Sequence, residues 1–157
     1  MTAPIPASGP PTSEGDPETG EWSGTRGEGL WLLPLWEGKW LTGVYGEDWN
    51  AAEEEAESHL TALATELDAR WGRHRTVSMR VPLLRSTTGT PLPEPYRTLA
   101  ATDCYGDLRV WGPLHEPTTP ATPRWLSLSL NQSDGDAPVI ITALITTYPI
   151  EELPDPA

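Results

Sequence analysis

One segment, residues 50–72, has an unbroken helical period, and it constrains the fold more than any other part of the chain. Its apolar residues recur at steps of three or four and share one stripe of a helix: Ala52, Ala56, Leu60, Leu63, Leu67 and Trp71. Asn50 and Glu53 have capping-box spacing, Asp48 is an alternative cap, and Gly72 can end the helix in a left-handed conformation. A helix of about 21 residues is roughly 32 Å long. With one apolar stripe, it needs a sheet to pack on.

Two short apolar runs precede this helix, at residues 30–36 and 39–45. The Glu37-Gly38 pair between them predicts a β-hairpin. Because Pro34 lacks a backbone N–H, the first of these strands is expected at a sheet edge or with a bulge at the proline.

Four further strands are predicted after the helix, at residues 76–85, 107–112, 124–130 and 139–148. The last of them is apolar on both faces and β-branched, which is typical of a central strand. Within the proline-rich connection 86–102, residues 95–101 are expected to form a short helical turn. The order β-β-α-β-β-β-β predicts an α+β domain, in which a mostly antiparallel sheet of about six strands packs against one long helix.

The ends of the chain differ in composition from this domain. Residues 1–28 hold five prolines among Gly, Ser, Thr and acidic residues, a composition that predicts a disordered tail. Residues 29–150 are then a single domain, and residues 151–157 a short acidic C-terminal tail.

The net charge is −13, with 23 acidic against 10 basic residues. Such acidity argues against binding to nucleic acid or to an anionic membrane and favours a basic protein partner. No signal peptide is expected, and the longest apolar run, at residues 139–144, is too short to span a bilayer, so a cytoplasmic location is predicted. Nine of the ten basic residues are arginine, which we interpret as a hint of bacterial origin.

The chain has no Cys-x-x-Cys, His-Glu-x-x-His, phosphate-binding glycine loop or Gly-x-Ser-x-Gly motif. We therefore expect no enzyme activity, no cofactor and no bound metal. The alternative is a small enzyme that uses the single cysteine, Cys104, with His74 or His115 as base. Because Asp103 next to it would raise the thiol pKa, a buried, unreactive thiol is the preferred interpretation.

The remaining signals are charge and aromatic content. Acidic residues are concentrated in the first half of the predicted helix. Because one helix can cover only one face of a sheet, some of the tryptophans should lie at the surface. The predicted partner-binding residues are Glu53, Glu54, Glu57, Trp36, Trp111 and Trp125.

These features predict a non-catalytic protein-binding module, such as an acidic immunity protein or chaperone that neutralises a basic bacterial partner. A self-assembling structural component of a phage or secretion particle is the main alternative. The formation of a homo-oligomer is left open.

Overall fold

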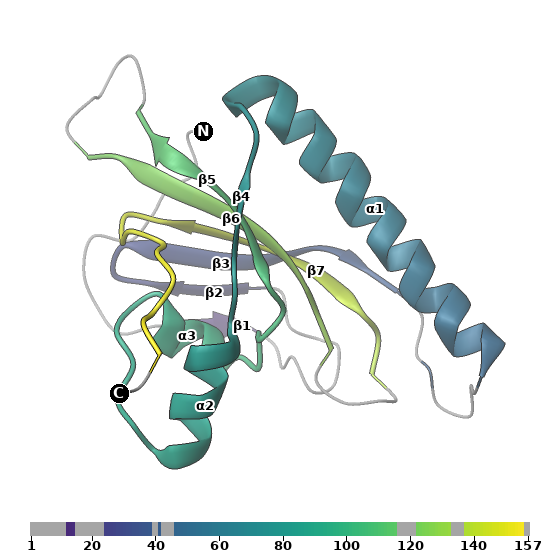
Figure 1. Ribbon diagram of the computed structural model, residues 1–157, viewed down its shortest axis with the longest axis horizontal. Helices are drawn as coiled ribbons and strands as arrows, with labels where there is room; N and C mark the ends of the chain where they lie inside the picture. Colours follow the sequence, from purple (N-terminus) through teal and green to yellow (C-terminus); the bar gives the residue numbers. More distant parts are fainter. Residues whose placement is uncertain are drawn as a thin grey trace.

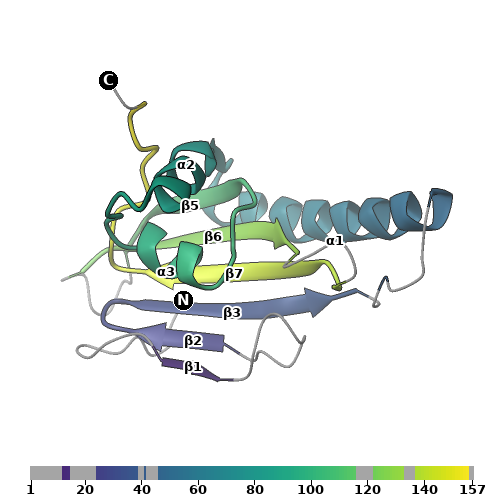
Figure 2. The same ribbon diagram turned by 90° about the horizontal axis from the view of Figure 1, so that it is seen from below.

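The computed structural model describes residues 12–14, 24–38, 41, 46–115, 122–132 and 137–155 of the chain. These residues form one antiparallel sheet with helices on both of its faces (Figures 1 and 2). The predicted α+β class with a mostly antiparallel sheet is therefore confirmed.

The sheet has seven strands, and every neighbouring pair is antiparallel. In order across the sheet they are β1 (Thr12–Glu14), β2 (Gly24–Gly27), β3 (Leu30–Glu37), β7 (Ile140–Thr146), β6 (Arg124–Asn131), β5 (Leu108–Leu114) and β4 (Arg75–Val77). Strand β7 lies in the middle and all of its residues are buried, as its apolar composition predicted.

Strand β3 lies between β2 and β7 rather than at an edge. Its pairing with β7 shifts register between Pro34 and Trp36, so the proline is accommodated by the bulge that was the alternative prediction. The second strand of the predicted hairpin, at residues 39–45, falls outside the described residues except for Leu41, which is buried.

Residues 24–27, which the sequence analysis placed in a tail, form β2 and pair with the first residues of β3. Thr25 is buried, and the guanidinium carbon of Arg26 lies 4.2 Å from the centre of the Trp31 ring. Because β1 also joins this edge, the sheet includes chain that precedes the predicted boundary at Gly29.

Helix α1 (Glu47–Trp71) covers one face of the sheet and packs on β5, β6 and β7. It begins earlier than predicted, with Gly46 as its N-cap and no side-chain capping hydrogen bond, so capping by Asn50 or Asp48 is wrong. Gly72 follows the last helical residue and its N–H donates to Asp68 O; its φ of 87° is positive, but its ψ of 172° lies outside the left-handed helical conformation that was predicted.

The predicted strand at residues 76–85 is wrong beyond Val77, because α2 (Arg80–Thr88) occupies most of this segment. Pro82 lies in the first turn of α2, where its missing N–H removes no helical hydrogen bond, and Gly89 ends the helix in the left-handed conformation. Val81 and Pro82 are buried, whereas Leu83 is 45% exposed.

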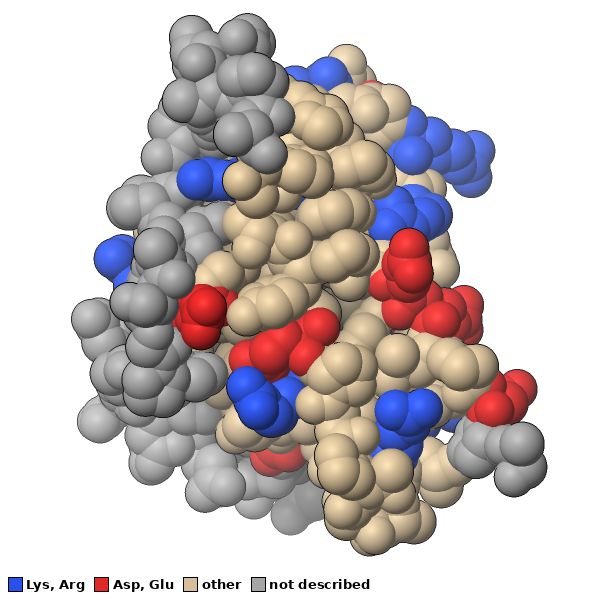
Figure 3. Space-filling view, turned by 90° about the vertical axis from the view of Figure 1, so that its left-hand side faces the viewer, with Lys and Arg blue, Asp and Glu red and all other residues tan. Residues whose placement is uncertain are grey.

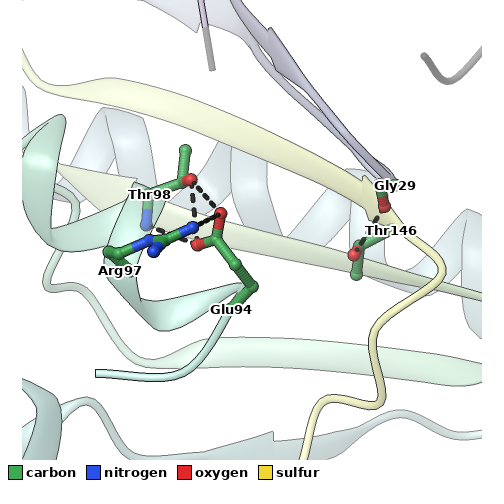
Figure 4. Close-up of polar contacts among 5 residues, drawn as sticks. All are labelled: Gly29, Glu94, Arg97, Thr98 and Thr146. Atoms are coloured by element: carbon green, nitrogen blue, oxygen red, sulfur yellow. Dashed lines mark hydrogen bonds and ion pairs between the residues drawn. The ribbon is translucent and has the colours of Figure 1, made fainter. Parts of the chain in front are cut away.

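The short helix predicted at residues 95–101 is present as α3 (Tyr96–Ala101). Figure 4 shows how it begins: the Glu94 carboxylate accepts hydrogen bonds from the backbone N and Oγ1 of Thr98, at 2.9–3.0 Å. The same view shows the Thr146 hydroxyl donating to Gly29 O at the end of β7.

Apolar side chains are buried on both faces of the sheet. The first layer, on the side of α3, contains Leu30, Leu32, Val77, Met79, Tyr96, Leu99, Cys104, Leu108, Val110, Leu144 and Ile150. The second layer, under α1, contains Leu60, Ala64, Trp111, Leu126, Leu128, Ile141, Ala143 and Ile145. A sheet covered on both sides leaves less aromatic surface exposed than the single-helix prediction assumed.

The chain after β7 returns across the first of these layers. Ile150 is fully buried, its carbonyl accepts a hydrogen bond from Arg75 Nη2 at 2.5 Å, and Tyr96 donates to Glu151 O. Asp155 pairs with Arg80. The segment predicted to be a tail from residue 151 is therefore held against the domain at two points.

Candidate functional site

The first half of α1 carries a run of carboxylates without a basic residue among them. We call these residues the acidic segment of α1: Glu47, Asp48, Glu53, Glu54, Glu55 and Glu57. All of them are exposed. Their position in the N-terminal half of the helix is favoured by the helix dipole, but like charges one turn apart repel each other.

Glu53 shows that the start of α1 lies beyond the sheet. The buried residues of α1 are Ala56, Leu60 and Ala64, which face the sheet. Glu53, one turn before Ala56, continues this stripe, yet it is exposed. Figures 1 and 2 show the reason: the first turns of α1 run past the ends of the strands they would otherwise cover.

The two flanks of the helix carry different groups. Toward β5, Glu57 Oε2 lies 3.9 Å from Arg109 Nη2. On the other flank Glu55 Oε1 lies 3.9 Å from His59 Nε2, which is the helix-surface contact that i,i+4 spacing favours. The His59 ring packs against Trp36 of β3, with 4.7 Å between ring centres. Half-buried Trp36 thus contacts α1 through His59, on the flank that also carries Glu55.

The three predicted tryptophans do not form one surface. Trp111 is only 2% exposed and is buried under α1, so its expected role as an exposed anchor is wrong. Trp125 is half-buried and packs against the layer on the opposite face of the sheet. The expectation failed because both faces are covered: α1 buries Trp111, and α3 and the C-terminal segment cover the face on which Trp125 lies.

Trp111 belongs instead to a polar network at the other end of α1. Asp68 Oδ1 accepts hydrogen bonds from Trp111 Nε1 at 3.1 Å and from the His74 backbone N at 2.9 Å, and it lies 2.9 Å from His74 Nδ1. The hydrogen bond with the His74 side chain is the main cause that lowers the pKa of Asp68. The network ties the end of α1 to β5, and no sequence motif indicates it.

Cys104 does not form a catalytic pair with either histidine. It is buried in the layer on the α3 side, whereas the His74 ring lies against Trp111 on the α1 side. Burial raises the pKa of the Cys104 thiol to about 11, which opposes formation of a thiolate nucleophile near neutral pH. His115 is exposed just beyond the end of β5.

Charges elsewhere on the molecule are mixed in sign. The face shown in Figure 3 has basic and acidic side chains interspersed over the described residues. Among the described residues, Arg97 pairs with Glu94 and Arg80 with Asp155. At the end of α1, Arg70 lies over the Trp71 ring, 5.5 Å from its centre. The acidic segment of α1 therefore differs from this face in carrying a single sign of charge.

Comparison of the chain with protein-family models, with curated proteins and with solved structures found no match. Within the described part of the chain, no helix has both the length and the apolar character needed to cross a membrane. The same residues contain no group of three or more His, Cys, Asp or Glu side chains placed to hold a metal ion.

Proposed function

We propose that this protein is a non-catalytic protein-binding module in which the acidic segment of α1 binds a basic protein partner. An immunity protein or a chaperone that neutralises a basic bacterial protein is the concrete form of this proposal. The observation that carries it is the exposure of Glu53 on the core-facing stripe of α1, beyond the ends of the strands. Glu53 therefore adds a carboxylate to the binding surface from the side of α1 that faces the sheet farther along the helix.

The energetics of the helix support the same conclusion. Glu53 and Glu57 are four residues apart and Glu54 and Glu57 are three apart, spacings at which like charges destabilise a helix. A cationic partner would relieve this repulsion. Its approach would also be accelerated by the field of a chain with a net charge of −13.

The test compares two variants with the same change in charge. In E53K/E54K two carboxylates of the acidic segment are reversed, and in E151K/E152K two exposed carboxylates of the C-terminal segment are reversed. The full chain is used first to capture a basic protein from a lysate of its native host. The affinity of that protein for each variant is then measured at two salt concentrations.

We expect E53K/E54K to weaken binding by about tenfold or more at low salt, and the control to change it by less than about twofold. The difference between the variants should shrink as salt is added, because exposed charges are screened. Equal effects of the two variants, or no effect of E53K/E54K, would contradict the proposal. The first result would show that only net charge matters, and the second that the partner binds elsewhere.

A further inference from the structure

A cleft of about 370 Å³ lies beside the acidic segment, between α1 and the edge of the sheet formed by β4 and β5. Helix α1 packs on β5, β6 and β7, and β4 extends beyond it as the last strand. The cleft is lined by Glu57, Leu60, Thr76, Gly106, Asp107, Arg109 and Leu130. Its volume falls within the range of about 300–1,000 Å³ typical of ligand-binding pockets.

Gly106, at the wall of this cleft, allows β6 to pass close by. A Cβ atom on this residue would lie 1.9 Å from the carbonyl oxygen of Leu130, which is closer than two such atoms can approach. The Gly106 N–H also donates to Asn131 Oδ1 at 2.9 Å. Strand β6 therefore passes directly against the backbone of Gly106, and no side chain of this residue projects into the cleft.

The lining joins an apolar part to a charged part. Leu60 and Leu130 supply the apolar part, while two carboxylates, Glu57 and Asp107, outnumber the guanidinium of Arg109. The 3.9 Å between Glu57 Oε2 and Arg109 Nη2 is longer than a hydrogen bond, so this contact leaves Glu57 able to accept other donors.

Asp107 can also accept further donors. Its Oδ1 accepts one hydrogen bond from the Met79 backbone N at 3.3 Å, and a carboxylate has about four acceptor positions in all. Glu53 and Glu54, one turn earlier on α1, add negative charge near the cleft. A cation is therefore favoured there over an anion.

We propose that this cleft receives one cationic side chain, an arginine or a lysine, of the basic partner. The inference rests on the function proposed above. Both side chains carry an apolar stem of several methylene groups and a charged head. The stem would pack on Leu60 and Leu130, and the head would donate hydrogen bonds to Glu57 and Asp107, turning Arg109 away from Glu57.

The probes are N-acetyl-arginine amide and N-acetyl-lysine amide, titrated separately into the isotope-labelled full chain and followed by NMR. N-acetyl-norleucine amide, which has a similar stem and no charge, is the control ligand. We expect saturable shifts in the millimolar range at the backbone amides of Thr76, Gly106 and Arg109. Tighter binding of the first amide would assign the site to arginine, and tighter binding of the second to lysine.

Three variants separate the cleft from the general acidity of the chain. E57Q/D107N removes two charges from the cleft with little change of shape, whereas T76W fills the cleft without changing charge. Thr76 is an exposed residue of edge strand β4, where tryptophan is well tolerated. We expect E57Q/D107N and T76W each to weaken binding of the cationic amides by about tenfold or more. The remote control E151Q/E152Q should bind them as the natural chain does.

The inference is overturned by any of three results: no saturable shifts with either cation, full binding by T76W, or equal loss in E151Q/E152Q. These failures are distinct from failure of the proposed function. If E53K/E54K abolishes capture of the basic protein while T76W does not, the proposed function holds, but the cleft is not where the partner's side chain binds. If the amides bind as expected while E53K/E54K leaves capture unchanged, the cleft binds a cationic side chain, but the proposed function fails.

Discussion

The substitution Gly106→Ala tests the close passage of β6 against the start of β5. The added methyl group would lie 1.9 Å from Leu130 O and 3.1 Å from Asn131 Oδ1. Leu130 pairs with Ile141 of the central strand, so its carbonyl cannot move away without disturbing β7. The alternative, a shift of residue 106 itself, weakens its hydrogen bond to Asn131.

The magnitude follows from three contributions. Overpacking against structure that cannot yield costs about 1–3 kcal/mol of unfolding free energy. Loss of the hydrogen bond adds about 0.5–1.5 kcal/mol, and the lower entropy of the unfolded chain with alanine returns about 0.4–1 kcal/mol. We therefore expect a net destabilisation centred on about 2 kcal/mol, within a range of about 0.5–4 kcal/mol, and a loss of about 2 kcal/mol lowers Tm by roughly 4–8 °C in a chain of this size.

Gly38→Ala is the matched control. A Cβ atom at Gly38 would meet the far end of the Trp36 ring at 3.3 Å and Val139 O at 3.4 Å, contacts that a small adjustment relieves. Both variants are unfolded in urea and followed by tryptophan fluorescence, which reports ΔG and the slope m together. We expect Gly38→Ala to remain within about 0.5 kcal/mol of the natural chain. A Gly106→Ala protein that is equally stable, or a control that loses as much, would refute the reasoning.

Three further predictions concern other parts of the fold. Above about pH 4 the natural chain should have a larger unfolding free energy than Asp68→Asn, and this difference should disappear as the pH falls through the lowered native pKa of Asp68. Urea unfolding at a series of pH values measures the difference, and a difference that does not change with pH would contradict the prediction. With its pKa raised to about 11, Cys104 should react with iodoacetamide at pH 8 far more slowly in the native protein than in urea. Rapid native alkylation would show that the thiol is accessible. Ile150→Ala should cost about 2–5 kcal/mol, because the residue is fully buried; a loss below about 1 kcal/mol in the same urea assay would show that the C-terminal segment contributes little to the core.

The long helix and the later strands were predictable because their residues obey a single period. The stripe from Ala56 to Trp71 has helical spacing along its whole length, and the α1 side of the sheet uses Leu126 and Leu128 of β6 as alternation requires. The central position of β7 followed from apolar residues on both of its faces. In each case burial and local periodicity agree, so tertiary packing does not override the pattern.

Helix α2 was missed because the apolar residues of this segment alternate as in a strand. The alternation runs from Val77 to Leu83, but β4 ends at Val77, and Val81 and Leu83 lie in α2. The signals that discriminate are Pro82 and Gly89, which stand at first-turn and C-terminal positions of a nine-residue helix. A proline inside a half-buried strand argues against that strand, since it cannot donate a hydrogen bond to the neighbouring strand.

The prediction for the tryptophans failed for a different reason. One long helix was expected to leave the other face of the sheet open, so Trp111 and Trp125 were predicted to be exposed. With α3 and the C-terminal segment on the second face, Trp125 packs inward there. Trp111 points the other way, toward α1, where its indole N–H reaches Asp68. Of the three rings, Trp36 is the one that is both half-buried and in contact with α1, through His59.

Whether the acidic segment is exposed depends on where the strands end relative to the helix, and no local sequence pattern reveals this. Periodicity places Glu53 on the same stripe as Ala56 and Leu60, and taken alone it would put a carboxylate against the core. A buried, unpaired carboxylate would be costly, so the stripe is compatible with a stable fold only if the sheet stops before this residue. The exposure of Glu53 shows that it does. The same charge that could not be tolerated over the strands is thereby available to a cationic partner.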